Sequence, residues 1–147
     1  MSRKFTQRFF AFIAALLLFF LLSGCSGGGE EEGVKLYPAD QLPEDVQAAS
    51  QAVQEAYQFT AANPDIMQHI PCYCGCGSMG HTSNYSCYIS SVDEAGNITF
   101  DNHALGCSIC VDITQDAMRM SAEGSSVDEI KAFVDVTYSK YGITNMP

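Results

Sequence analysis

A dense group of cysteines constrains this chain more than any other feature. Six of its seven cysteines lie between positions 72 and 110, and three of them alternate with Tyr73 and Gly75. Thiolate sulfur is a soft ligand that prefers Cu(I), Zn(II) and iron–sulfur clusters to hard cations. We therefore interpret the group first as a soft-metal site. Its predicted ligands are Cys72, Cys74, Cys76, Cys87, Cys107 and Cys110.

The first three of these cysteines are spaced two residues apart. A disulfide between such neighbours would be strained, because the bond needs a suitable separation and dihedral angle. Each of them must therefore find partners elsewhere in the chain. Glycine tolerates positive φ, so we expect Gly75 and Gly77 to let the backbone curl and direct several sulfurs toward one point.

Cys107 and Cys110 are spaced as a chelating pair at the start of a predicted helix. Exposed N–H groups and the helix dipole favour thiolates at that position. Imidazole commonly accompanies thiolate in zinc and copper sites, so His81 and His103 are additional candidate ligands. Six thiolates exceed the four ligands of an ordinary structural zinc site, which leaves room for a polynuclear Cu(I) cluster or a second site.

Residues 1–24 have the pattern of a bacterial lipoprotein signal. Basic residues precede an apolar run over 9–22, which is shorter than the roughly 20 residues of a membrane-spanning helix. The run leads into Leu-Ser-Gly-Cys at 22–25, which matches the lipobox pattern. We predict cleavage before Cys25, lipid on its thiol and attachment to the extracytoplasmic side of the cell membrane. The alternative is an uncleaved anchor.

The predicted mature chain is strongly acidic. Removing residues 1–24 leaves four basic residues against 17 acidic ones, a net charge of −13. Such a surface repels phosphate backbones, so we expect no nucleic-acid partner. The expected partners are the membrane, through the lipid anchor, a metal ion, and a metal-handling or redox protein.

The remaining chain divides into a tether and one domain. Residues 25–35 contain the lipidated cysteine and a Gly- and Glu-rich stretch that cannot bury apolar surface, so we expect a flexible tether. Residues 36–147 have the length of one ordinary domain, which we predict to be a cysteine-rich metal-binding domain.

Helical periodicity and capping residues predict a mainly α domain, with α+β as the alternative. We expect about three helices around a cysteine-rich loop over 72–86, with one small β-hairpin. Ser126 and Glu129 form a capping-box signature. The expected segments are helices over 45–62, over 107–122 and from Ser126 (stripe Val127, Ile130, Val134, Thr137 and Tyr141), a helical turn over 65–69, and a hairpin of 88–90 with 97–100.

Residues 71–76 read Pro-Cys-Tyr-Cys-Gly-Cys and resemble the PCYCGC-motif family of bacterial lipoproteins. The similarity extends over His81, Cys87, 103–107 and Cys110 and through the last predicted helix. It implies a secreted, membrane-tethered protein in which these residues act as one unit. It implies no particular activity, substrate or metal.

Three functions fit these patterns. The leading hypothesis is a lipid-anchored protein that binds Cu(I) or Zn(II) for metal buffering, delivery or structure. The second is a thiol–disulfide oxidoreductase using Cys107 and Cys110, and the third is a disulfide-stapled structural or interaction module. No hydrolase or phosphate-binding motif occurs in the sequence, so we expect no enzyme outside the redox alternative.

Overall fold

The computed structural model describes residues 34–147. The predicted signal peptide, the predicted lipidation site Cys25 and most of the predicted tether lie outside these residues. No helix within 34–147 is long and apolar enough to span a membrane. The elements in chain order are η1 (Ala39–Gln41), α2 (Glu44–Gln47), α3 (Gln51–Ala62), α4 (Pro64–Met67), η2 (Cys76–Met79), η3 (Tyr85–Cys87), β1 (Ile89–Val92), β2 (Ile98–Phe100), η4 (His103–Gly106), α5 (Ser108–Ala122), α6 (Val127–Tyr138) and η5 (Ser139–Tyr141).

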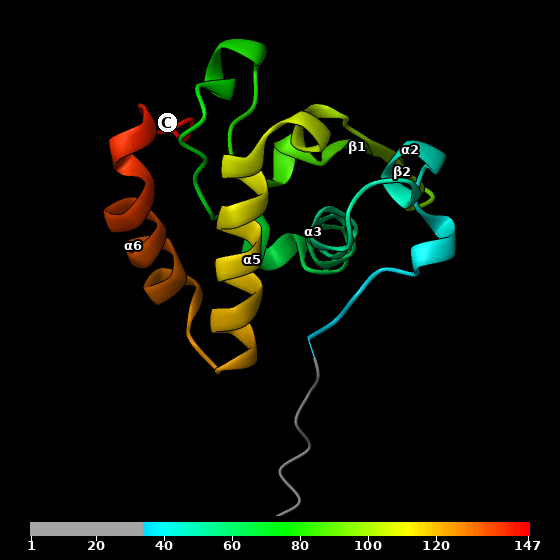
Figure 1. Ribbon diagram of the computed structural model, residues 1–147, viewed down its shortest axis with the longest axis horizontal. Helices are drawn as coiled ribbons and strands as arrows, with labels where there is room; N and C mark the ends of the chain where they lie inside the picture. Colours follow the sequence, from blue (N-terminus) through cyan, green and yellow to red (C-terminus); the bar gives the residue numbers. More distant parts are fainter. Residues whose placement is uncertain (1–33) are drawn as a thin grey trace, which may run out of the picture. The chain divides into compact units, whose positions relative to one another are not determined.

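Three longer helices, α3, α5 and α6, form the scaffold, which confirms the expected mainly α fold. Helix α5 packs against both of the others; α6 runs beside it, and α3 is seen nearly end-on in Figure 1. The contact faces follow the helical period of the sequence. Ile113 and Ala117 of α5 are fully buried, as are Ile130 and Val134 of α6.

Helix α6 begins at the predicted capping box. The backbone N–H of Glu129 donates to Ser126 Oγ at 3.4 Å, and the Glu129 carboxylate accepts from the Ser126 N–H at 2.8 Å. The far end of the stripe differs from prediction. Tyr138 is buried, whereas Tyr141 is 55% exposed, because the α-helix gives way to the 3-10 turn η5 and the period changes.

The helix predicted over 45–62 is interrupted, so the prediction of one continuous helix is wrong. Helix α2 ends at Gln47, and α3 starts after Ser50, whose backbone is extended (φ −63°, ψ 154°). The side-chain amide of Gln54 donates to the carbonyls of Gln47 and Ala49, both at 2.9 Å. These bonds satisfy carbonyls that the break releases from the helix.

The predicted hairpin is present with slightly shifted bounds. Strands β1 and β2 pair antiparallel, and the register is irregular between Ile89 and Ser91. The connecting turn is held by Asp93, whose carboxylate accepts from the N–H groups of Ala95 and Asn97. This hairpin is the only sheet among the described residues.

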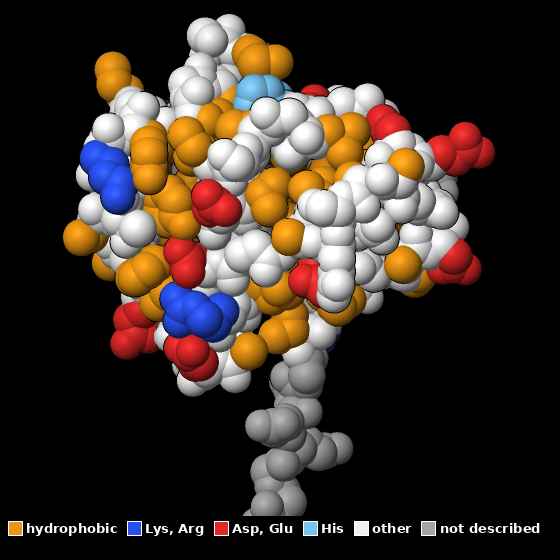
Figure 2. All heavy atoms as spheres, in the orientation of Figure 1, with side chains coloured by type: hydrophobic (Ala, Val, Ile, Leu, Met, Phe, Trp, Pro, Cys, Tyr) orange, Lys and Arg blue, Asp and Glu red, His pale blue; other side chains and the backbone are white. Residues whose placement is uncertain are grey.

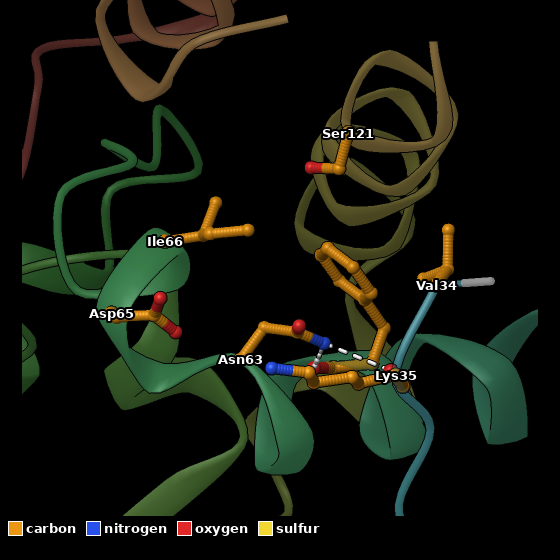
Figure 3. Close-up of a pocket in the computed structure, with 7 residues that line it drawn as sticks. Val34, Lys35, Asn63, Asp65, Ile66 and Ser121 are labelled. Carbon is orange, nitrogen blue, oxygen red and sulfur yellow. Dashed lines mark hydrogen bonds between the residues drawn. The ribbon is translucent and has the colours of Figure 1, made fainter. Parts of the chain in front are cut away.

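The first described residues contact α3. The Asn63 side chain donates to the Lys35 carbonyl at 2.9 Å, and the Tyr37 N–H donates to the Gln58 carbonyl at 3.0 Å. Val34, Lys35 and Asn63 line a pocket of about 180 Å³ with Ser121 of α5 (Figure 3). No cysteine or histidine lines this pocket, so it is separate from the predicted metal site.

On the face drawn in Figure 2, acidic side chains are scattered and the basic ones stand singly. Arg119 is paired with Asp116 at 3.0 Å, and Lys131 is paired with Asp135 at 2.9 Å. The face drawn in Figure 2 shows no continuous basic surface that could follow a phosphate backbone.

Candidate metal centre

The first four predicted ligands lie in the cysteine loop, which we define as residues 71–87, between α4 and β1. The 3-10 turns η2 and η3 are its regular elements. Gly75 adopts φ 85°, as expected for the curl between Cys74 and Cys76. The prediction of positive φ at Gly77 is wrong, because the 3-10 turn η2 already contains that residue.

The six predicted cysteine ligands converge on one place and are all free thiols. The closest sulfur pairs are Cys72–Cys74 at 3.4 Å, Cys72–Cys110 at 3.5 Å, and both Cys74–Cys110 and Cys76–Cys87 at 3.6 Å. A disulfide requires about 2.05 Å. No disulfide therefore joins these residues. Four of the thiols are buried, while Cys74 and Cys107 are half-buried.

Both candidate histidines lie at the same place. His103 Nε2 is 3.4 Å from Cys74 Sγ, and the rings of His81 and His103 meet edge to face with centroids 5.1 Å apart. His81 is buried, and its Nδ1 has no hydrogen-bond partner. The third histidine among the described residues, His69, is exposed and belongs to no group of metal-ligand donors.

These eight side chains form overlapping sets whose donor atoms lie within 4.8 Å of one another. Sulfur and imidazole nitrogen are the donors that soft and borderline metals prefer, so the sets can hold a metal ion. The three sets are Cys72, Cys74, Cys76 and Cys87; Cys74, His103, Cys107 and Cys110; and Cys76, His81, Cys87 and His103.

The crowding of thiols shifts their pKa values. The hydrogen bond with Cys110 lowers the pKa of Cys72, and the same bond raises the pKa of Cys110. Burial, with the nearby Cys72, raises the pKa of Cys74 and Cys76. Metal ligands must be deprotonated, so metal binding to thiols whose pKa is raised releases protons.

Comparison with known proteins places this chain in a family. The model of a family described as "Protein of unknown function with PCYCGC motif" matches residues 15–147. The chain belongs to the PCYCGC-motif family. No curated protein and no solved structure matches it. The motif itself spans 71–76 and supplies three of the eight donors.

A residue near the end of the chain holds the PCYCGC motif in place. The Asn145 side chain accepts from the Cys72 N–H at 2.7 Å and donates to Cys76 Sγ at 3.4 Å and to the Ser83 carbonyl at 3.0 Å. Its backbone N–H donates to the Cys72 carbonyl at 3.0 Å. Sequence reasoning missed Asn145, because no local pattern links it to residues 73 positions earlier.

The segment before Asn145 also packs tightly on the motif. A Cβ built on Gly142 would lie 2.6 Å from the Tyr73 carbonyl oxygen, so only glycine allows this approach. The Tyr73 hydroxyl donates to Asp135 of α6 at 2.5 Å. The motif is therefore fixed from the C-terminal segment and from α6.

A buried polar network supports Cys110 from the other side. Asn84 is fully buried, and its Nδ2 donates to Thr114 Oγ1 at 2.7 Å. Thr114 in turn donates to the Tyr88 hydroxyl at 2.9 Å and lies 3.1 Å from the Cys110 carbonyl. The sequence offered one weak signal for this network, polar residues on an otherwise apolar helix face.

Cys107 is placed as predicted at the start of α5, where it is the N-cap residue. It also lines a surface pocket of about 360 Å³ with Leu105 and Val111. Cys110, in the first turn, is fully buried. The pair therefore combines one half-buried and one fully buried cysteine.

Proposed function

We propose that this protein is a membrane-anchored extracytoplasmic lipoprotein that binds a soft metal ion, Cu(I) or Zn(II), through its cysteine cluster. Its role is metal buffering, delivery or structure. The lipobox match at 22–25 supports the anchor at Cys25, and the acidic composition favours the approach of cations.

A triangle of sulfur atoms carries the metal assignment. The three sulfurs of Cys72, Cys74 and Cys110 are separated by 3.4, 3.5 and 3.6 Å. Sulfurs about 2.3 Å from a tetrahedral Zn(II) lie about 3.8 Å from one another, so the triangle has nearly the sulfur spacing of a zinc site. His103 Nε2, 3.4 Å from Cys74 Sγ, adds a nitrogen donor beside this face.

Charge explains why a metal suits this cluster. Several thiolates in a buried space repel one another, and burial disfavours each charged form. A bound cation supplies the positive charge that lets these thiols ionise together at neutral pH. The chain contributes the enclosure, since Cys72, Cys76, Cys87 and Cys110 are each at most 1% exposed.

The partial exposure of two of the six cysteines favours exchange of the bound metal over a purely structural role for it. Cys74 and Cys107 are half-buried, and Cys107 opens to the pocket of about 360 Å³. An incoming thiol from a metal-handling protein can therefore reach the cluster there. We propose that metal enters and leaves through Cys107.

Anaerobic purification of the full-length chain in mild detergent tests the function. We expect stoichiometric uptake of Zn(II) or Cu(I), measured by elemental analysis, and protection of the cluster thiols from a thiol reagent. The Cys25→Ser variant is the matched control: it should keep the metal and lack the lipid that mass spectrometry detects on Cys25 of the wild type. Failure to take up either metal contradicts the proposal, and a wild-type chain without lipid on Cys25 contradicts the anchor.

A thiol–disulfide oxidoreductase is the second candidate, favoured by the accessible Cys107 and the buried Cys110 three residues later. Redox pairs use an exposed attacking thiol and an enclosed resolving one. A thioredoxin-like fold needs parallel strands, whereas the described residues contain one antiparallel pair. Disulfide reductase activity of the full chain that is lost in Cys107→Ser supports this function, and an inactive wild type excludes it.

A further inference from the structure

We infer that the eight donors form two four-coordinate metal sites. The inference rests on the proposed function and extends it to the number of ions. The helix site consists of Cys74, His103, Cys107 and Cys110. The loop site consists of Cys72, Cys76, His81 and Cys87.

The helix site gathers donors from three segments. Cys107 and Cys110 come from the start of α5, His103 from η4 and Cys74 from the cysteine loop. The four donor atoms lie within 4.8 Å of one another. Cys74 Sγ is 3.4 Å from His103 Nε2 and 3.6 Å from Cys110 Sγ, separations close to those of ligands on one zinc ion.

The loop site is built within the cysteine loop. The sulfurs of Cys76 and Cys87 are 3.6 Å apart, and a ring nitrogen of His81 lies within 4.8 Å of both. Cys72 Sγ is within 4.8 Å of the same two sulfurs. The site therefore has three thiols and one imidazole, the same composition as the helix site.

His81 gives independent support for the loop site. Its Nδ1 is buried and has no hydrogen-bond partner, which carries a free-energy cost unless a ligand occupies that position. Its Nε2 faces the Asp101 carboxylate at 3.8 Å. Metal-bound histidines commonly direct their other nitrogen to a carboxylate, which orients the ring.

The division uses every donor once. Each site receives three sulfurs and one nitrogen, a ligand set that is established for tetrahedral zinc. A single divalent ion in the helix site would leave four donors without metal. These are three buried thiols and His81, whose Nδ1 has no hydrogen-bond partner. Two divalent ions offset more of the thiolate charge, which matters because uncompensated buried charge is costly.

Cys72 connects the two sites. Its sulfur lies 3.4 Å from Cys74 and 3.5 Å from Cys110, both in the helix site, although we assign it to the loop site. Cys72 therefore lies at the boundary between the two sites, and the two ions are close neighbours.

Zinc stoichiometry of the full-length chain, measured anaerobically in mild detergent, tests the inference. We expect two Zn(II) per wild-type chain and one in each of two double variants, Cys76→Ser with Cys87→Ser and Cys107→Ser with Cys110→Ser. His81→Gln should lower the affinity for one of the two ions by about tenfold or more, whereas His69→Gln, at an exposed position, should change the affinity for neither ion.

X-ray absorption of the zinc-loaded wild type gives a readout that does not depend on whether the variants fold. We expect an average of three sulfurs and one nitrogen per ion. A single zinc in the wild type, an all-sulfur shell, or a folded double variant that loses both ions overturns the inference. Uptake of Cu(I) but not Zn(II) also overturns the two-site inference but leaves the proposed function intact. Uptake of neither metal contradicts both the inference and the proposed function.

Discussion

The start of α5 and the cysteine loop supply cysteines to one cluster, but different forces hold them in place. Cys110 belongs to a regular helix whose next turns bury Ile113 and Ala117 against the other helices. In the cysteine loop the buried residues include the donors themselves, Cys72, Cys76 and Cys87. Ordinary core packing therefore preforms one half of the cluster, whereas we expect the other half to depend on bound metal and a few hydrogen bonds.

Metal removal should give the largest difference between the cysteine loop and the helices. We expect chelation to strip hydrogen-exchange protection from residues 72–87 while α5 and α6 keep theirs. A site loaded at 1,000 times its dissociation constant contributes about 4 kcal/mol to the free energy of unfolding. Hydrogen exchange with and without chelator measures both regions together, and equal loss of protection in α5 would contradict the division.

A cavity between the helices should lower the stability of the fold without changing the metal content. Ile130→Ala removes a fully buried side chain of α6, so we expect the free energy of unfolding to fall by about 2–5 kcal/mol. The metal content should stay at the wild-type value. Urea denaturation and elemental analysis measure the two effects; the control Val136→Ala, at an 83% exposed position, should shift stability by no more than about 0.5 kcal/mol.

Asn145→Ala tests the hydrogen bonds that fix the cysteine loop. It deletes the side-chain bonds to Cys72 N, Cys76 Sγ and the Ser83 carbonyl, for an expected loss of about 1–3 kcal/mol. Metal should pass to a competing chelator faster, which stopped-flow transfer measures. Asn97→Ala, in the exposed turn of the hairpin, is the matched control, and equal transfer rates in the two variants would show that Asn145 has no positioning role.

Ser126→Ala should have the smallest effect. It tests whether a change in α6 alone affects the cysteine loop. Losing the α6 cap costs about 1 kcal/mol and leaves a hydrogen bond to Glu129 unmade. We expect a lower thermal midpoint with an unchanged rate of metal transfer. A changed transfer rate would mean that α6 and the cysteine loop are coupled more tightly than their contacts indicate.

The sequence predicted most of the fold because its signals were local. The Ser126 capping box, the apolar stripe with Ile130 and Val134, and the Cys107 helix start each depend on neighbours a few residues apart. The break at Ser50 was missed, because the apolar period continues across it and Gln54 compensates from the next turn.

The candidate site was predictable in its members but not in its arrangement. Residue type and spacing identified the six cysteines, His81 and His103 as candidate ligands. The division into donor sets depends on how the cysteine loop folds back on α5, and so do the contacts of Asn145 and Asn84. Such contacts join residues far apart in the chain, where no periodicity indicates them.

We expect the buried Tyr88 to act as an optical reporter of the cluster. Its hydroxyl accepts from Thr114, which also contacts the Cys110 carbonyl, and its ring meets Tyr57 edge to face at 4.8 Å. The chain contains no tryptophan, so tyrosine emission is not masked by indole. Intrinsic fluorescence should therefore follow filling of the cluster without any attached dye, and a Tyr88→Phe chain would identify the share of the signal that arises at this ring.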